Sequence, residues 1–201
     1  SVPIIDLAGL ADGEAGALAR VAREIGHACR ETGFFYVRGH GVAAADIAAV
    51  FDAAHTFFAL PQAQKDALGL TASTGNRGYV GLRTEALDPA SGIDDKEAMN
   101  IGLELAADDP EIAAGVPSRR PNLWPPHLPG FRDVTLSYFA DMLTLGRNLH
   151  RAIAQDLGLK PDHFTPHFER PMATLRLLRY PPPQARENGL GAGAHTDYGN
   201  L

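Results

Sequence analysis

Several features that define large classes of protein are scarce or missing in this sequence. A single cysteine, Cys29, among 201 residues rules out an internal disulfide and a cage of thiolate metal ligands. It falls on the apolar face of a predicted helix, and we interpret it as a core residue. No stretch of about 18 uninterrupted apolar residues occurs, and residues 1–6 lack the basic and apolar regions of a signal peptide. We therefore expect a cytoplasmic protein.

Basic residues are outnumbered as well. The 18 lysines and arginines face 24 aspartates and glutamates, which gives a net charge of −6, and the basic residues form no block. Such a chain has nothing that attracts the phosphate backbone of a nucleic acid or an anionic lipid surface. We expect neither a nucleic acid nor a membrane as a partner.

What the chain does contain is the composition of an ordinary globular protein. Apolar residues make up 45% of it and charged residues 21%, which excludes disordered and collagen-like chains. The 21 glycines and 15 prolines indicate many turns and short strands, and they argue against a fold made of helices alone.

Apolar residues at helical spacing predict three helices. The first runs from about residue 13 to Gly33, the second has its apolar stripe over 47–58, and the third and longest has its stripe over 136–157. Pro61 should stop or restart the second helix, and Gly158 should end the third. The predicted strands are residues 4–7, a buried strand at 34–37, then 78–82, 97–101, 174–180 and 191–201, and the segment 71–129 is rich in loops.

His195 and Asp197 are the chemically most informative pair. They are two residues apart on a predicted strand, so both side chains point from the same face. An imidazole and a carboxylate so placed, with a third ligand from elsewhere, form the facial triad that holds Fe(II) and leaves adjacent positions for a co-substrate and dioxygen. The spacing alone is a weak signal, because a chain with 8 histidines contains such a pair by chance about as often as not.

Two other arrangements are weaker candidates for a ligand pair. His163 and His167 have the spacing of two ligands on a helix, but Pro166 disfavours a regular helix there. His167 and Glu169 repeat the histidine-x-carboxylate spacing in a segment that we predict to be a loop.

The surroundings of His195 and Asp197 make that pair more specific. Residues 191–201, which read GAGAHTDYGNL, and residues 178–182, which read LRYPP, resemble the metal-binding strand of the isopenicillin N synthase-like family of Fe(II)/2-oxoglutarate dioxygenases. The resemblance covers essentially the whole chain, because earlier motifs follow in the family's order. These motifs are VPIIDL at 2–7, GFFYVRGHGV at 33–42, FFALP at 57–61 with Lys65, RGYV at 77–80, and Lys96 with Glu97.

The resemblance implies an α+β fold whose core is a double-stranded β-helix, or jelly roll, with helices packed outside it. Residues 1–130 would be the family's N-terminal region of helices and strands, and residues 131–201 the long helix and the first part of the barrel. In the family, the third iron ligand is a histidine that would lie beyond Leu201, as would the arginine and serine that hold 2-oxoglutarate. We therefore expect this sequence to be the N-terminal part of a longer protein, with an incomplete jelly roll.

The strand at 174–180 adds further site residues. Arg176, Leu178 and Tyr180 share one strand face, where an apolar core would not accept polar groups, so we expect this face to line a site. By resemblance, Tyr180 contacts the co-substrate 2-oxoglutarate, while Leu178 stands where plant-type members carry an asparagine. We expect Arg176 to contact the substrate.

Arg77 and Arg83 are two more candidates for substrate binding. They lie on either side of Tyr79 in a loop that, by resemblance, reaches the mouth of the barrel. A fork of two arginines there would suit a carboxylate substrate. The alternative is that both are solvated loop charges.

The resemblance implies an enzyme, a non-haem Fe(II)- and 2-oxoglutarate-dependent dioxygenase. Its partners would be dioxygen and a small organic substrate, which it would hydroxylate, desaturate or close into a ring while 2-oxoglutarate gives succinate and carbon dioxide. Two alternatives stay open. One is an Fe(II) oxidase of the same fold that uses no 2-oxoglutarate, and the other is a non-catalytic jelly-roll binding protein.

Overall fold

The computed structural model of the chain describes residues 1–85, 94–117 and 119–182. Its backbone forms two compact units. The first joins Ser1–Ala48 with Ser137–Pro171, and the second joins Ala49–Leu136 with Met172–Leu201. Each unit draws on two stretches of the chain, and the predicted division into residues 1–130 and 131–201 stays a prediction.

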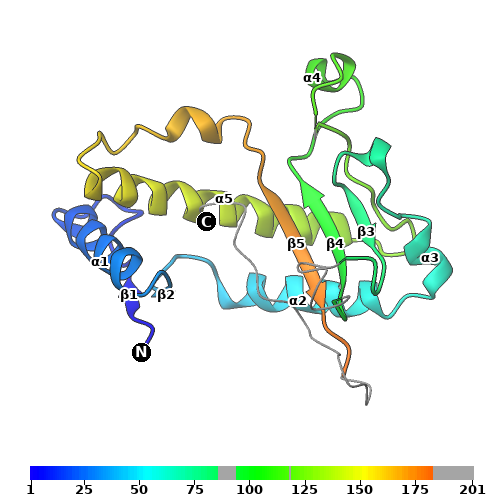
Figure 1. Ribbon diagram of the computed structural model, residues 1–201, viewed down its shortest axis with the longest axis horizontal. Helices are drawn as coiled ribbons and strands as arrows, with labels where there is room; N and C mark the ends of the chain where they lie inside the picture. The colour runs from blue at the N-terminus through cyan, green and yellow to red at the C-terminus, as the bar shows by residue number, and fades with distance from the viewer. Residues whose placement is uncertain (86–93, 118, 183–201) are drawn as a thin grey trace. The chain divides into compact units, whose positions relative to one another are not determined.

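The first unit contains a two-stranded parallel sheet packed against helices. Strands β1 (Ile4–Asp6) and β2 (Tyr36–Arg38) pair side by side, and α1 (Ala17–Glu31) connects them (Figure 1). The predicted helix begins at Ala17 because Gly16, just before it, has a left-handed φ of 83°. The other helices that contribute to this unit are the first turn of α2 (Ala44–Phe58), most of α5 (Phe131–Asp156) and the 3-10 helix η2 (Thr165–Phe168).

The core of the first unit forms between α1, β1 and α5. Val21 and Ile25 in the predicted stripe of α1 are 0% and 1% exposed. The guanidinium of Arg20 donates hydrogen bonds to the carbonyls of Asp6, at 2.7 Å, and Ala8, at 3.0 Å, and so ties α1 to the end of β1. The buried cluster consists of Ile5, Leu7, Leu10, Val21, Ala22, Ile25, Ala28, Leu149 and Ala152.

Two expectations about this core are wrong. The strand predicted as buried at 34–37 is one edge of a two-stranded sheet, so its side chains alternate: Phe35 and Val37 pack on the core, whereas Phe34 and Tyr36 are 69% and 65% exposed. Cys29 is exposed and not part of the core. It lies in the last turn of α1, just beyond the point where the core ends at Ala28.

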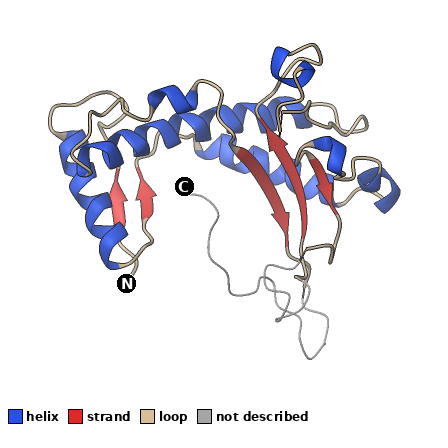
Figure 2. Cartoon of the chain, turned by 45° about the horizontal axis from the view of Figure 1, so that its top comes forward, coloured by secondary structure: helices blue, strands red, loops and turns tan. Residues whose placement is uncertain are grey.

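The second unit is built on a three-stranded antiparallel sheet, which Figure 2 shows as its three long arrows. Its order is β3 (Gly78–Val80), β4 (Glu97–Gly102) and β5 (Thr174–Arg179), which confirms the three strands predicted here. The register pairs even-numbered residues with even and odd with odd, so each face carries residues of one parity. We call them the even face (Gly78, Val80, Ala98, Asn100, Gly102, Thr174, Arg176, Leu178) and the odd face (Tyr79, Glu97, Met99, Ile101, Leu175, Leu177, Arg179).

The odd face packs on an aromatic cluster. The ring of Phe57, from the end of α2, lies 6.1 Å from that of Tyr79 and 5.4 Å from that of Phe131 at the start of α5. Met99 and Ile101 on the same face are fully buried. The even-face residues of β3 and β4 are buried as well, so both faces of these two strands are covered.

Pro61 restarts the chain as a helix, one of the two outcomes predicted for it. It precedes α3 (Gln62–Asp66), and its φ of −52° suits the position before a helix. The remaining short elements of the second unit are the 3-10 helix η1 (Ala72–Thr74) and α4 (Pro110–Ala113).

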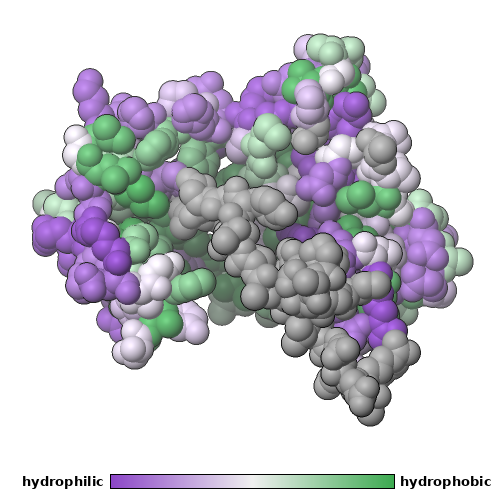
Figure 3. Space-filling model, in the orientation of Figure 1, coloured by the Kyte–Doolittle hydropathy of each residue, from purple (hydrophilic) through white to green (hydrophobic). Residues whose placement is uncertain are grey.

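The long helix α5 ends as the sequence predicts. Gly158 adopts a φ of 72°, and the amide of Leu159 donates to the carbonyl of Ala154 at 2.8 Å. Among the described helices, α5 included, none is both long and apolar enough to cross a membrane. The surface drawn in Figure 3 mixes hydrophilic and apolar side chains.

Candidate active site

The predicted iron ligands His195 and Asp197 lie outside the described residues, so this pair stays a prediction. Over residues 1–85, 94–117 and 119–182, no group of three or more histidine, cysteine, aspartate or glutamate side chains is arranged to hold a metal ion. The weaker alternatives around His167 therefore gain no support. His163 instead stacks edge-on against Phe164, with ring centroids 4.9 Å apart.

The strand that leads toward the predicted ligands is β5, and its even face carries the expected site residues. Arg176, Leu178 and Tyr180 are all at least partly exposed, whereas Leu177 on the odd face is buried. Arg176 stands opposite Asn100 on β4, and Leu178 opposite Ala98. The predicted grouping of Arg176 with Leu178 on one face is confirmed, and Tyr180 follows directly after the strand.

Charged side chains gather beside Arg176. Its guanidinium forms an ion pair with the carboxylate of Glu85. Lys96 is buried, with its Nζ 2.8 Å from an oxygen of Asp94 and 3.7 Å from an oxygen of Glu85. Two cations and two carboxylates thus meet here, and each cation has a carboxylate partner.

Arg77 and Arg83 do not form the predicted fork. The guanidinium of Arg77 lies where a side chain at Gly102 would be, at one end of β4. The Nε of Arg83 lies 2.5 Å from an oxygen of Asp95, before the other end of the strand. The six residues of β4 span about 17 Å between them.

Neither arginine is a freely solvated loop charge. Arg77 is 3% exposed and donates to the carbonyls of Gly75 and Asn76. Burial lowers the pKa of Arg77, and the positive charge of the neighbouring Arg119 lowers it further. Because Arg77 covers Gly102 on the even face, it shares that face with Arg176, and Arg83 does not join them.

The odd face holds a buried ionic cluster, which sequence reasoning missed. The carboxylate of Glu97 accepts hydrogen bonds from Lys65 at 2.8 Å, from the Tyr79 hydroxyl at 2.6 Å and from Arg179 at 2.5 Å. Lys65 also donates to the carbonyl of Phe58. In the sequence, Lys65, Tyr79 and Glu97 stand out only as parts of motifs. The available signal was a charged residue at the start of a mostly apolar strand and a lysine seven residues after a buried aromatic pair.

The charges in this cluster stabilise one another. Burial alone would raise the pKa of Glu97, but the hydrogen bonds from Lys65, Tyr79 and Arg179 outweigh burial and hold that pKa below its usual value. Burial, together with the bond to Glu97, raises the pKa of Tyr79 to about 12. At neutral pH the cluster therefore contains a carboxylate, a neutral phenol and two cations. It fixes Arg179, the residue immediately before Tyr180.

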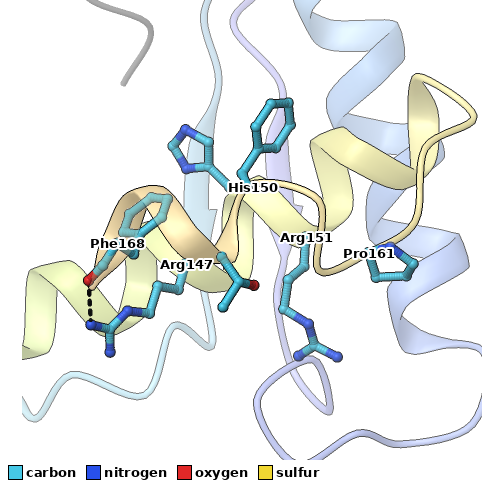
Figure 4. A pocket seen from close by; sticks show the side chains of 7 residues that line it. Arg147, His150, Arg151, Pro161 and Phe168 are labelled. Atoms are coloured by element: carbon cyan, nitrogen blue, oxygen red, sulfur yellow. Dashed lines mark hydrogen bonds between the residues drawn. The ribbon is translucent and has the colours of Figure 1, made fainter. Parts of the chain in front are cut away.

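Two cavities that are lined by described residues lie away from these side chains. One, of about 10 Å³, is lined by residues of α5 and η2 that include Arg147, His150 and Phe168, and Figure 4 shows the Arg147 guanidinium donating to the Phe168 carbonyl. That volume holds about one water molecule and excludes an organic substrate. The other, of about 370 Å³, lies between α2 and residues 128–134. None of the predicted site residues lines either cavity.

Comparison with known proteins places the chain in a family. Residues 2–127 match the family model described as the N-terminal region of the non-haem dioxygenase in morphine synthesis. The chain belongs to this family of non-haem dioxygenases. The motifs noted above from residue 2 to Glu97 all fall within the matched region.

Individual relatives agree with this assignment. The 2-oxoglutarate-Fe(II) type oxidoreductase hxnY of Emericella nidulans is 33% identical over 98% of this chain and 58% of its own length. A full-length Neurospora crassa protein, solved in complex with alpha-KG and thymine, superposes with a TM-score of 0.81 at 28% identity, over 98% of this chain and 62% of that one. A putative 2OG-Fe(II) oxygenase from Caulobacter crescentus gives a TM-score of 0.78 at 27% identity, over 94% and 59%.

The dioxygenase family thus accounts for the arrangement of the described elements, and the chain spans about 60% of the length of these relatives. The described sheets are small and open, one of two strands and one of three.

Proposed function

We propose that the protein is a non-haem Fe(II)- and 2-oxoglutarate-dependent dioxygenase that oxidises a small organic substrate. Membership of the dioxygenase family carries this proposal, and the His195-x-Asp197 spacing in a glycine-rich segment supports it. We also propose that the β3, β4 and β5 sheet is part of a jelly roll, with its even face toward the interior, because that face carries Asn100 and Arg176.

The donor set fits iron. His195 and Asp197 would supply one imidazole and one carboxylate from the same face of the predicted strand, donors that suit Fe(II), and a second histidine would complete the set by analogy with the family. When bound, iron and 2-oxoglutarate supply the oxidant for a C–H bond of the substrate while 2-oxoglutarate is converted to succinate and carbon dioxide.

The protein's own residues would position the reactants. Tyr180 would donate its phenolic hydrogen bond to 2-oxoglutarate, and Arg176 would hold the substrate on the same face. The bond from Arg179 to Glu97 restrains the end of β5, on which the place of Tyr180 depends. In this proposal the odd face supplies rigidity and the even face supplies contacts to the reactants.

A pair of variants in the full-length protein tests the iron ligands. His195→Ala should abolish Fe(II)-dependent formation of succinate from 2-oxoglutarate across a substrate panel. His167→Ala is the matched control, since it removes a histidine with the same spacing to a carboxylate, Glu169, and should keep activity. Equal succinate formation by wild type and His195→Ala would refute the assignment.

The two alternatives give different results in the same assay. An Fe(II) oxidase of the same fold would consume dioxygen and substrate without forming succinate. A non-catalytic binding protein would form no product with any substrate and would bind its ligand equally well without iron.

A further inference from the structure

The even face of the three-stranded sheet holds two buried polar atoms that have no hydrogen-bond partner among the described residues. Asn100 is 3% exposed, and its amide nitrogen donates to Oδ1 of Asn76 at 2.9 Å. Its own Oδ1 is buried and has no hydrogen-bond partner within the described chain. Nε of Arg176 is also buried and has no hydrogen-bond partner within the described chain, whereas a terminal nitrogen of the same guanidinium donates to Glu85.

These two atoms belong to one place on the sheet. Asn100 and Arg176 are directly opposite each other in the register of β4 and β5, where side chains of paired residues start about 5 Å apart. One group is an acceptor and the other a donor. Buried polar atoms in proteins are nearly always satisfied, so an unused pair of opposite type on a face proposed to line the active site indicates a ligand contact.

We propose that Asn100 and Arg176 form a substrate subsite for a neutral cis-amide group, such as a lactam or cyclic imide. The ligand N–H would donate to Oδ1 of Asn100, and the adjacent ligand C=O would accept from Nε of Arg176. This inference rests on the proposed function, because it identifies the even face as the substrate side.

A carboxylate fits this place less well than an amide. A carboxylate has no hydrogen to donate, so one of its oxygens would face the Asn100 Oδ1 acceptor. The charge of Arg176 is already matched by Glu85, and that of Lys96 by Asp94. The third cation here, the guanidinium of Arg77, is held over Gly102 and donates to backbone carbonyls.

Matched probes test both halves of the subsite. The full-length protein, loaded with Fe(II) and 2-oxoglutarate without oxygen, is titrated calorimetrically with 2-pyridone, with N-methyl-2-pyridone, which lacks the N–H donor, and with benzoate. We expect 2-pyridone to bind about tenfold more tightly than either of the others, the usual effect of one hydrogen bond to a buried polar group.

Three variants assign each contact to its residue. Asn100→Leu should weaken 2-pyridone about tenfold and leave N-methyl-2-pyridone unchanged, because only the first probe uses the Asn100 acceptor. Arg176→Lys, which keeps a cation for Glu85, should weaken both probes. Gln64→Leu is the matched control: it also removes a buried acceptor without a partner in the described chain, but on α3, and it should change neither.

Several outcomes would overturn the subsite. They are equal binding of the two pyridones, tighter binding of benzoate, an equal effect of Asn100→Leu on both pyridones, and no saturable binding of 2-pyridone in the millimolar range. Arg176 is partly exposed, so Arg176→Lys keeps the test decisive if Asn100→Leu does not fold. Succinate formation measured in parallel separates the two proposals: probe binding as expected without any turnover refutes the dioxygenase activity and leaves the subsite standing.

Discussion

Breaking the buried pair between Lys65 and Glu97 should cost the protein a large part of its stability. The two side chains are 6% and 2% exposed, and their N–O distance is 2.8 Å. Removing one partner of a buried ion pair costs about 3–5 kcal/mol, because the other charge is left in a site with little water. Glu97 keeps bonds from Tyr79 and Arg179 when Lys65 is lost, so Lys65→Met belongs near the lower limit, at about 3 kcal/mol.

A double-mutant cycle measures this coupling. Lys65→Met, Glu97→Gln and the double variant are unfolded with urea at pH 7, and the free energies of unfolding are compared. The double variant should lose about 1–3 kcal/mol less than the two single losses together, because it leaves no charge of the Lys65–Glu97 pair behind. Lys160→Met is the matched control, since Lys160 is exposed and its removal should cost no more than about 0.5 kcal/mol.

The pH dependence of the same cluster gives a second readout. The folded pKa of Glu97 lies below its usual value of 4.5, so the stability that it contributes is present above that pH and is lost as the pH falls through the folded value. The difference in stability between wild type and Glu97→Gln should therefore shrink in acid. Additive single losses, or a cost of Lys65→Met below about 1 kcal/mol, would refute the view that this pair is a coupled buried unit.

Further predictions concern the phenol of the cluster and two glycines. The pKa of Tyr79 is raised from 10.0 to about 12, so its contribution is present below pH 10 and is lost as the pH rises toward 12; Tyr79→Phe should flatten the decline in stability over that window, as alkaline unfolding curves would show. Gly78→Ala should destabilise by at least about 2 kcal/mol, because φ is 112° and the new Cβ would lie 2.4 Å from the Leu68 carbonyl oxygen. Gly146→Ala within α5 meets only Phe168, at 3.6 Å, and should stabilise by up to about 1 kcal/mol in the same urea assay.

The sequence predicts most of the described elements because their signals are local. Apolar spacing gives the three helices, and Pro61 and Gly158 mark their boundaries through backbone preferences that need no tertiary context. The strand at residues 34–37 shows the limit of this reasoning. Its aromatic and β-branched residues favour a strand, but burial of both faces depends on how many neighbours the strand acquires, and here it has one.

The residues of the candidate site also divide into those that the sequence predicts and those that it does not. The shared face of Arg176 and Leu178 follows from strand alternation, which any extended segment obeys. Whether Arg77 and Arg83 form a fork depends on the path of the chain around them and on the length of β4. Neither of these can be predicted from the local sequence. The cluster around Glu97 joins residues 18 to 82 positions apart, so only the folded chain brings them together.

The two faces of the sheet are linked through the register of β5. A slip of one residue would turn Arg176 and Leu178 to the odd face and bring Leu177 to the even face, because side chains alternate with a period of two. Apolar contacts alone oppose such a slip only weakly, because this strand has leucines on both faces. Leu175 and Leu177 lie on the odd face and Leu178 on the even face. The bond from Arg179 to the buried carboxylate of Glu97 opposes it directly, because it exists only in the native register. The ion pair between the half-exposed Arg179 and the buried Glu97 on the odd face thus holds Arg176 opposite Asn100 on the even face. Because Glu97 holds Arg179 and so the register of β5, Glu97→Gln should weaken the binding of 2-pyridone as well as lower the stability of the protein. This is expected although Glu97 does not face the proposed subsite.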